Sequence, residues 1–529
     1  MSIASIDQAL SMTEHFGTHE CHRFRERIFN THAFLCAKLA KQYTHTANKA
    51  GHVKANQELR QFHQWLTLGP HFNGLFIDSN CEEVSRFAEQ KTKELSRLFK
   101  GTKKRYKRGY ALERLIKKLA DCDLTLPIDD PYSAETKALA AAIARVLDPQ
   151  WWRRQIRSRQ DYYLEYVQIN LNCVNHKAGI YSSDECVRRK LQQWQRNELI
   201  LSGLEAENDL GDVFCLLDLA KRGVSNVVNR RNELMTRMRG FENYATAHGH
   251  TAVFYTITAP SRYHQYLSSP CIPNSKYKGA SPSDTQTYFN TLFKRARAKL
   301  HRSGIHPYGF RVVEPHHDGT PHWHILFFME PNQVSQTTEV LRHFALQEDG
   351  NESGASQYRF KAKIIDPAKG SATGYIAKYI AKNIDGYNVI GDHYGFDAIE
   401  SAIRIRAWAS NWNIRQFQQI GGPSVTVWRE ARRLAVQPNA DLILASIDDA
   451  TLNGITQAAN NGDWCEYFEW SGGASTACKE RPVRALHVKK ELPNKYGEIT
   501  KKIIGILLRS TQTIITRLRV WEVRSKPNT

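Results

Sequence analysis

The chain has 529 residues, of which 41% are hydrophobic and 10% aromatic; this is ordinary for a folded protein, and the length prior is ~3 domains. Its 73 lysines and arginines against 53 acidic residues give a formal net charge of +20, which suits a polyanionic partner, nucleic acid before an anionic membrane. No run of about 18 uncharged apolar residues occurs, which excludes a membrane-spanning helix and predicts no membrane partner.

The first part of the chain, residues 1–245, is predicted to be a mostly helical, basic region. Its amino terminus lacks the basic start and apolar run of a secretory signal, so we expect a cytoplasmic protein. Basic residues with interleaved aromatics cluster at 100–110 and 151–159, a mixture that suits phosphate contact with base stacking. The alternative is a solvated helix face with two core tryptophans, and the sequence leaves both open. On the first of these two interpretations, we expect residues 1–245 to contact DNA.

Two helices close this region. Ser182 and Glu185 fit a capping box that starts the first helix, and the second is expected from about 226 to 248, ending at Gly249.

Residues 246–435 differ from the helical region before them, because predicted strands alternate with helices, and they are predicted to form the catalytic domain. Strands are expected at 252–258, 308–314, 322–329 and 358–365, and helices at 284–303, 336–347 and 371–383. The turn PHHDGTP joins the second and third strands as a hairpin, which favours an antiparallel sheet and an α+β fold. Residues 436–529 carry no motif and have no assigned role, although 500–520 are predicted to be a basic amphipathic helix.

A histidine pair lies on the third predicted strand. His322 and His324 point to the same side of the strand, about 7 Å apart, and Trp323 points to the other side. Glu314 ends the preceding strand and becomes a cross-strand neighbour of the pair once the hairpin forms. One carboxylate and two imidazoles with open positions suit Mn²⁺ or Mg²⁺. His316 and His317 lie in the turn and are expected to be solvated, the alternatives being a place behind the metal ligands or one facing DNA.

The predicted helix at 371–383 contains the tetrad Tyr-Ile-Ala-Lys twice in succession. Residues four apart lie ~40° apart on one helix face, so Tyr375 and Tyr379 stand together. Lys378 and Lys382 form a neighbouring row, and two tyrosines beside two lysines make a poor core.

These groups suit a tyrosine nucleophile. A phenol with an ordinary pKa near 10 is a weak nucleophile, and a metal on the scissile phosphate and nearby ammonium groups favour its attack. Attack on DNA gives a 5′-phosphotyrosine and a free 3′-hydroxyl, and religation then needs no ATP. A second tyrosine one turn away can attack a second junction while the first is occupied.

The chain resembles the replication gene A proteins of Peduovirus-type temperate phages, members of the HUH endonuclease superfamily. Residues 254–258 (FYTIT) are similar to that superfamily's first motif, Glu314 with His322-Trp323-His324 to the second, and Tyr375 and Tyr379 to the paired-tyrosine third. Residues 151–154, 181–185 and 230–235 are similar to segments of the phage proteins, and the resemblance covers roughly 145–435.

The resemblance implies an HUH-type antiparallel sheet with flanking helices, which uses Mg²⁺ or Mn²⁺ to nick a phage replication origin in the host bacterial cytoplasm. The 3′-hydroxyl then primes a host polymerase. The sequence contains no phosphate-binding loop of the GxxxxGK[ST] type, so unwinding is expected to come from a host helicase. Two alternatives stay open: a non-catalytic origin or single-strand DNA-binding protein, and an HUH relaxase or transposase.

Overall fold

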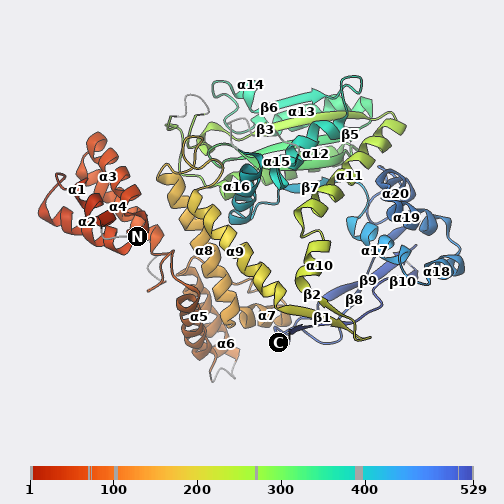
Figure 1. The fold of residues 1–529 in the computed structure, drawn as a ribbon, viewed down its shortest axis with the longest axis horizontal. Coiled ribbons are helices and arrows are strands. Elements are labelled where there is room, and N and C mark those ends of the chain that lie inside the picture. The colour runs from red at the N-terminus through yellow and green to blue at the C-terminus, as the bar shows by residue number, and fades with distance from the viewer. Residues whose placement is uncertain are drawn as a thin grey trace. The chain divides into compact units, whose positions relative to one another are not determined.

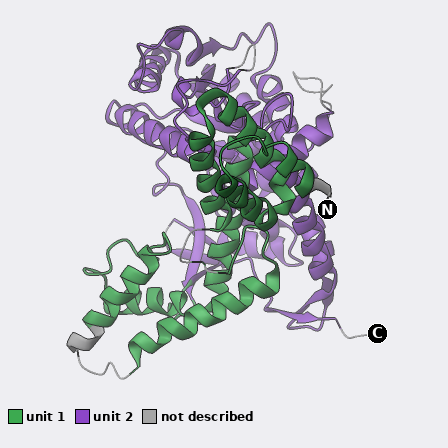
Figure 2. Ribbon diagram, turned by 90° about the vertical axis from the view of Figure 1, so that its left-hand side faces the viewer, with its two compact units in different colours: residues 1–173, 490–500 green, residues 174–489, 501–529 purple. Residues whose placement is uncertain are grey.

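The computed structural model describes residues 4–68, 72, 74–100, 105–267, 272–387, 397–509 and 511–526. Of the basic cluster predicted at 100–110, residues 101–108 lie outside the described side chains. The chain forms two compact units, one of residues 1–173 with 490–500 and one of residues 174–489 with 501–529 (Figure 2). Helices and antiparallel sheets both contribute (Figure 1), which confirms the α+β prediction. The domain boundaries predicted near residues 245 and 435 separate segments by their expected roles, and these boundaries stay predictions.

The first unit is helical, as predicted. Its helices are α1 (Ala4–Ser11), α2 (His19–Thr31), α3 (Cys36–Ala50), α4 (His52–Leu66), α5 (Cys81–Ser96), α6 (Arg105–Ala120), α7 (Thr136–Val146) and α8 (Pro149–Asn170). Helix α8 contributes to two hydrophobic clusters, because Leu164 and Val167 pack with α2–α4 whereas Trp152 and Ile156 pack with α5–α7.

The second basic cluster, at 151–159, is largely structural. Trp151 and Trp152 are 7% and 0% exposed and belong to the core of this unit. The guanidinium of Arg159 donates to the carbonyl oxygens of Leu68 and Cys122, at 3.1 Å each. The alternative of core tryptophans is therefore correct for this cluster, and Arg153 and Arg154 are its exposed cations.

The second unit contains the remaining elements. Its helices are α9 (Asp184–Ser202), α10 (Leu216–Arg222), α11 (Val227–Ala247), α12 (Pro282–Arg302), α13 (Val334–Leu346), α14 (Ala355–Tyr358), α15 (Ala372–Ile384), α16 (Ala398–Asn411), α17 (Val425–Ala435), α18 (Ala440–Ile447), α19 (Ala450–Asn461) and α20 (Trp464–Trp470). Helix α9 begins one residue later than predicted: the hydroxyl of Ser183, not of Ser182, accepts from the backbone N–H of Cys186. No helix of the described residues combines the length and the apolar character that crossing a bilayer demands.

The main sheet of this unit is antiparallel, in the order β6-β3-β5-β4-β7. Its strands are β3 (Thr251–Thr258), β4 (Tyr308–Pro315), β5 (Pro321–Met329), β6 (Phe360–Ile364) and β7 (Phe417–Ile420). The predicted β4–β5 hairpin is confirmed, and its turn is closed by a hydrogen bond from His316 N to Thr320 O of 2.8 Å. Gly319 has the positive φ of 80° that this turn requires.

Helices cover both faces of the sheet. Buried residues of α11 and α15 pack on the face that carries Phe310, Val312 and Leu326. On the opposite face, Phe289 of α12 stacks on Trp323, with ring centroids 5.2 Å apart. Helix α15 is thereby held against the strands that carry the predicted metal ligands.

Two smaller sheets complete the unit, in the orders β10-β9-β8 and β11-β1-β2. Their strands are β1 (Leu204–Asn208), β2 (Val213–Cys215), β8 (Val483–Lys489), β9 (Lys501–Leu508), β10 (Gln512–Ile515) and β11 (Trp521–Ser525). The helix predicted at 500–520 is therefore wrong. Ile504, Ile506 and Leu508 also fit a period of two, and the many β-branched isoleucines favour a strand that pairs with β8 and β10.

Candidate active site

The hairpin places an acid and two imidazoles on one face of the main sheet. Glu314 of β4 is the register partner of His322 of β5, and the rings of His322 and His324 have centroids 4.7 Å apart. This follows from the alternation of strand side chains, which turns the intervening Trp323 to the other face. The three groups predicted as metal ligands therefore lie together.

Glu314 is buried and holds three polar partners. Its Oε1 lies 3.0 Å from His324 Nε2, while its Oε2 accepts from Asn383 Nδ2 at 3.2 Å and lies 3.7 Å from Lys382 Nζ. Burial raises the pKa of Glu314, but the charge of Lys382 and the hydrogen bond with His324 outweigh burial and hold the pKa well below its ordinary value. The carboxylate is therefore ionised and accepts only, so His324 donates to it from Nε2, while Nδ1 of the same ring is hydrogen-bonded with Thr256 Oγ1 at 3.2 Å.

His322 is oriented through its other ring nitrogen. Its Nδ1 lies 2.8 Å from His316 Nε2 and 3.2 Å from Thr258 Oγ1, which leaves Nε2 to face a ligand. Burial first, and then the neighbouring imidazoles of His316 and His324, lower the pKa of His322 well below its ordinary value. At neutral pH the ring is therefore neutral, the form that binds a metal.

The two turn histidines differ from the prediction. His317 is buried, and His316 hydrogen-bonds to His322 rather than to solvent. Burial lowers the pKa of His316 to about 3, so this ring is also neutral. The expectation of solvated loop residues is wrong because other segments cover the turn: Tyr181 N donates to His317 O at 3.4 Å and Trp408 Nε1 donates to Gly319 O at 2.8 Å, while His316 lies behind a predicted ligand.

Helix α15 brings both tyrosines to this face. The hydroxyl of Ser371 caps the helix at Gly374 N, and Ile376 and Ile380 anchor it in the core. The ring of Tyr379 lies 4.1 Å from that of His324, between centroids, whereas Tyr375 packs one turn away against Phe254 at 4.8 Å. Tyr379 thus adjoins the metal-ligand group directly.

The hydroxyl of Tyr379, beside His324, keeps its proton at neutral pH because its pKa is raised. Burial raises the pKa of Tyr379, and the charge of Glu314 and the neighbouring Tyr375 raise it further. A cation bound at Glu314 would oppose that effect.

The two predicted lysines have different positions. Lys378 lies with its ammonium 5.0 Å from the ring of Tyr375 and 4.9 Å from that of Tyr379, whereas Lys382 binds Glu314. Tyr375 and Lys378 also line a cavity of about 460 Å³ that contains two further lysines, Lys363 and Lys369. A phosphate group that enters this cavity would meet three ammonium groups beside a tyrosine, although one of them, on Lys369, lies 3.7 Å from the carboxylate of Asp366, which also lines the cavity.

A divalent ion fits this donor set. Glu314 Oε1 and His324 Nε2 are 3.0 Å apart, which matches two adjacent ligands each about 2.1 Å from an octahedral ion. Such an ion would replace the proton that these atoms now share. No three His, Cys, Asp or Glu side chains within the described ranges are already arranged as a complete cage, so at least one of Glu314, His322 and His324 would shift for all three to bind one ion.

Sequence reasoning missed several groups that orient the site. Thr256 and Thr258 hydrogen-bond to the two histidines, and their alternation on the first predicted strand was a readable signal. Asn383 joins Glu314 from one turn beyond Tyr379, and Tyr181 lies under the ammonium of Lys382 at 5.2 Å. No local pattern links residue 181 to this site.

The whole arrangement falls within a known family. The model of the family described as bacteriophage replication gene A protein matches residues 79–387, which include every residue named above as a metal ligand or nucleophile. That match begins upstream of residue 145, where the resemblance was predicted to begin. No solved structure matches the chain.

Relatives of this chain come from phages and prophages. The replication gene A protein of Escherichia phage 186 is 42% identical over 397 residues, covering 73% of this chain and 56% of that protein. The probable replication protein P12 of Pseudoalteromonas phage PM2 is 41% identical over 398 residues, covering 73% and 60%. A probable replication endonuclease from a prophage-like region of Salmonella paratyphi A is 37% identical over 375 residues, covering 69% and 47%.

The chain spans about half the length of the curated relatives it matches. The match to the family model nevertheless takes in more than half of this chain. The chain therefore belongs to the family of bacteriophage replication gene A proteins.

Proposed function

We propose that the chain initiates rolling-circle replication by nicking one strand of a phage origin and forming a 5′-phosphotyrosine, as an endonuclease of the HUH type. The observation that carries this proposal is the contact of Tyr379 with His324, on the sheet face that also holds Glu314. The names of the relatives, replication proteins and a replication endonuclease, support a role on replicating DNA.

The covalent step conserves one phosphodiester bond. The phenol loses its proton and its oxygen attacks the phosphorus, while the bond from phosphorus to the 3′ oxygen breaks and that oxygen takes up a proton and leaves as a hydroxyl. The fragment downstream of the nick stays on the tyrosine through its 5′ phosphate, so no ATP is consumed.

The chain's own residues prepare this step. Glu314, His322 and His324 would hold Mg²⁺ or Mn²⁺, which supplies charge stabilisation at the scissile phosphate when bound. Lys378, between the two rings, offers a counter-charge to the phosphate.

The second tyrosine extends the reaction. Tyr375 lies one helical turn from Tyr379 and lines the lysine-rich cavity, so it is placed to attack a second junction while the first tyrosine carries DNA. The freed 3′-hydroxyl would prime a host polymerase inside the bacterial host. A host helicase would unwind the duplex, because the sequence contains no phosphate-binding loop for a motor.

The test is the formation of a covalent adduct. The protein is incubated with a single-stranded oligonucleotide from the phage origin and Mn²⁺, and a denaturing gel shows whether DNA migrates with protein. We expect an adduct that disappears in the double variant Tyr375→Phe, Tyr379→Phe and in EDTA.

The matched control is Tyr358→Phe, a tyrosine that is 59% exposed on the same unit and lies outside the site. It should form the adduct at the wild-type rate. Specific binding without any adduct, across oligonucleotides that tile the origin, would instead identify a non-catalytic origin-binding protein. An adduct on a transfer origin or transposon end but not on the phage origin would identify a relaxase or transposase.

A further inference from the structure

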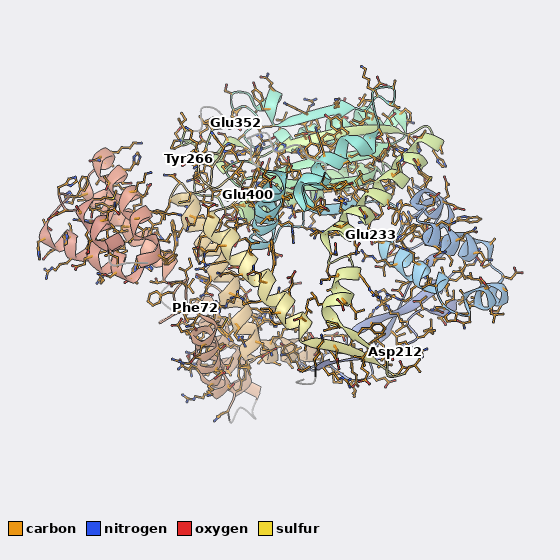
Figure 3. The ribbon with its side chains drawn as sticks, in the orientation of Figure 1. Phe72, Asp212, Glu233, Tyr266, Glu352 and Glu400 are labelled. Atoms are coloured by element: carbon orange, nitrogen blue, oxygen red, sulfur yellow. The ribbon has the colours of Figure 1, made fainter. Side chains whose placement is uncertain are left out.

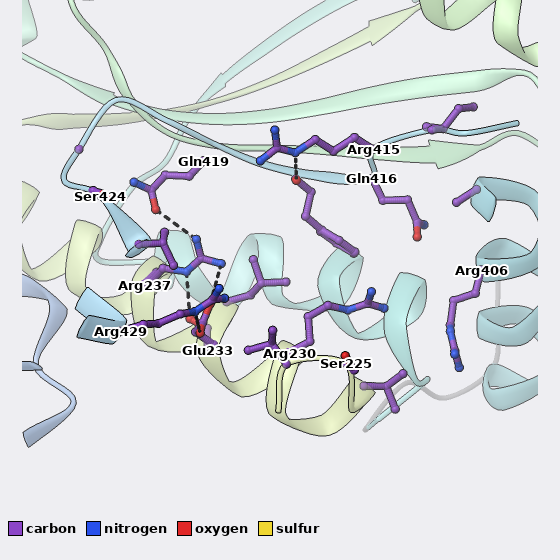
Figure 4. Close-up of a pocket in the computed structure, with 18 of the residues that line it drawn as sticks. Ser225, Arg230, Glu233, Arg237, Arg406, Arg415, Gln416, Gln419, Ser424 and Arg429 are labelled. Atoms are coloured by element: carbon purple, nitrogen blue, oxygen red, sulfur yellow. Dashed lines mark hydrogen bonds and ion pairs between the residues drawn. The ribbon is translucent and has the colours of Figure 1, made fainter. Parts of the chain in front are cut away.

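An arginine-rich cavity lies in the second unit, beside the edge strand β7. Its volume is about 920 Å³, and its wall contains five arginines, Arg230, Arg237, Arg406, Arg415 and Arg429 (Figure 4). Glu233 of α11, also labelled in Figure 3, is the one acidic residue among its described lining residues. The cavity is therefore strongly positive.

The single acid does not neutralise these arginines. Glu233 lies 2.8 Å from Arg429 and 3.5 Å from Arg237, so its charge is already shared by two of them. Arg230, Arg406 and Arg415 make no ion pair within 4.0 Å among the described residues, and the one acid outside the cavity whose charge acts on Arg230 and Arg406 is Asp385, which is paired with Arg231. The Nε of Arg230 is buried and has no hydrogen-bond partner there. Five arginines around one lining acid leave an excess of positive charge that favours the binding of an anion.

A second basic cavity adjoins the first. It has a volume of about 670 Å³, and no acidic residue is among its described lining residues. Its cationic and imidazole side chains are Lys294, Arg297, His301, His306, Arg311 and Arg481. Lys294 and Arg297, both on α12, are exposed and free to move toward a ligand.

The two cavities meet at one turn. Gly421, Gly422 and Cys478 line both of them. Gly421 and Gly422 both have a positive φ, and a Cβ on Gly422 would lie 2.5 Å from the ring of Phe241. The turn between the cavities therefore requires glycine at residue 422. A single phosphate could contact the cations of only one cavity, whereas a chain of phosphates could contact those of both. The shape therefore favours a polymer over a mononucleotide.

The cavities are separate from the tyrosine face but connected to it. Neither is lined by Glu314, by the two histidines or by the two tyrosines, as far as the described residues go. Gln416, in the wall of the first cavity, donates to Asn383 Oδ1 at 3.4 Å, and Asn383 donates to Glu314 at 3.2 Å. Two hydrogen bonds, through Gln416 and Asn383, thus connect the wall of the first cavity to Glu314, the proposed metal ligand.

We propose that these two cavities form a binding track for the phosphate backbone of single-stranded DNA, distinct from the site where the strand is cut. This inference rests on the proposed function, because the bound strand is the one that the tyrosines would attack. The track would hold DNA through charge, without reading its sequence.

The experiment measures DNA binding without cleavage. A fluorescent origin oligonucleotide is titrated in EDTA with the Tyr375→Phe, Tyr379→Phe protein over a range of salt concentrations. The track variant adds Lys294→Ala and Arg297→Ala, and the matched control adds Arg295→Ala and Lys299→Ala, two exposed cations of the same helix that line neither cavity.

The track variant is expected to lose two phosphate contacts. The slope of log K against log salt should fall by about 1.4, and binding at 0.1 M salt should weaken ~25-fold. The control should stay within about twofold of its parent. A second pair of changes, Arg406→Gln and Arg415→Gln, should weaken binding to a similar extent from the other cavity. Equal losses in the track variant and in the control would overturn the proposal, since overall charge would then explain binding.

A measurement on the wild-type chain guards against misfolding of a variant. Acetylation of surface lysines followed by mass spectrometry should show that oligonucleotide protects Lys294 and leaves Lys299 reactive. A nucleoside triphosphate should not displace the oligonucleotide at equal phosphate concentration. Protection of neither lysine, or full displacement by the nucleotide, would contradict a backbone track.

The outcomes separate the two proposals. If no adduct forms but Lys294 and Arg297 still set the salt slope, the proposed nicking function fails and the track stands. If the adduct forms and the track variant binds like its control, the track fails and the nicking function stands.

Discussion

The two faces of the main sheet carry different chemistry, although the same strands build both. One face presents Glu314, His322 and His324 to the tyrosine helix. The other buries Trp323, whose Nε1 donates to Gln286 Oε1 at 3.0 Å. The polar side chains of one face thus lie directly opposite a buried, tightly packed tryptophan on the other face.

The contrast between the two faces shows what fixes the pairing register of β4 and β5. A slip of one residue between β4 and β5 would exchange the faces, placing Trp323 at the proposed metal site and the histidines in the apolar core. Arg311 lies over the indole at 4.1 Å, and Phe289 and Phe293 flank it, so the slip would forfeit all of these contacts. The back face therefore fixes the position of the ligands on the front face.

The largest expected effect comes from breaking that anchor. Trp323→Ala removes a fully buried indole and should lower the free energy of unfolding by about 4 kcal/mol. Urea denaturation followed by circular dichroism measures the change. Trp470→Ala, at a side chain that is 38% exposed, should cost under about 1 kcal/mol. Equal costs for the two variants would show that the back face does not carry the register.

The next effect comes from the front face. Glu314→Gln keeps the shape of the side chain but removes its charge, and we expect Mn²⁺ affinity to fall several hundred-fold, on the order of 3 kcal/mol. Isothermal titration with Mn²⁺ measures the affinity, and the adduct assay should follow it. Glu330→Gln, an exposed acid just after β5, is the control and should change neither. Wild-type affinity in Glu314→Gln would remove this residue from the proposed metal site.

Sequence periodicity was sufficient for the front face. The two histidines at a spacing of two, with an acid on the paired strand, required only strand alternation, and the tyrosines required only the helical period. Those signals are local, and each element is long and strongly patterned. The positions of β3, β4, β5 and α15 follow from them to within a few residues.

Other parts of the site depend on contacts that no local pattern records. The turn that carries His316 is buried because Tyr181 and Trp408, both far from it in the sequence, hydrogen-bond to its carbonyl oxygens, and Tyr181 also reaches Lys382. The strand β9 was mistaken for a helix because its apolar residues fit both periods, and only pairing with β8 and β10 decides between them. Tertiary contact, not propensity, settles such segments.

The two tyrosines should contribute unequally to the first cleavage. Tyr379 adjoins His324, so Tyr379→Phe should slow the appearance of the first nick by about 50-fold, while Tyr375→Phe should change it less than about threefold. Single-turnover assays with a labelled oligonucleotide measure both rates. Mass spectrometry of the wild-type adduct should place the nucleotide on Tyr379. A nucleotide found on Tyr375 alone would reverse the assignment.

The smallest expected effect tests the hydroxyls that orient the histidines. Thr256→Val keeps the size of the side chain but removes the hydrogen bond to His324 Nδ1, so the ring is no longer fixed with Nε2 toward Glu314. Mn²⁺ affinity should fall about tenfold, as expected for a group that orients a ligand without touching the ion. Thr258→Val acts on His322, which keeps His316 as a second partner at the same nitrogen, so its loss should be smaller.

Thermal unfolding of both threonine variants distinguishes orientation from stability. Thr256 pairs with His324 and Lys361 and Thr258 pairs with His322, and these register partners remain in place, so the melting temperatures of the two variants should match each other. If Thr258→Val weakens Mn²⁺ binding more than Thr256→Val does, His316 does not hold His322, and the buried turn histidine has no part in orienting the ligand. If Thr256→Val leaves the affinity unchanged, the hydrogen bond to Glu314 alone fixes His324, and the front face needs no help from β3.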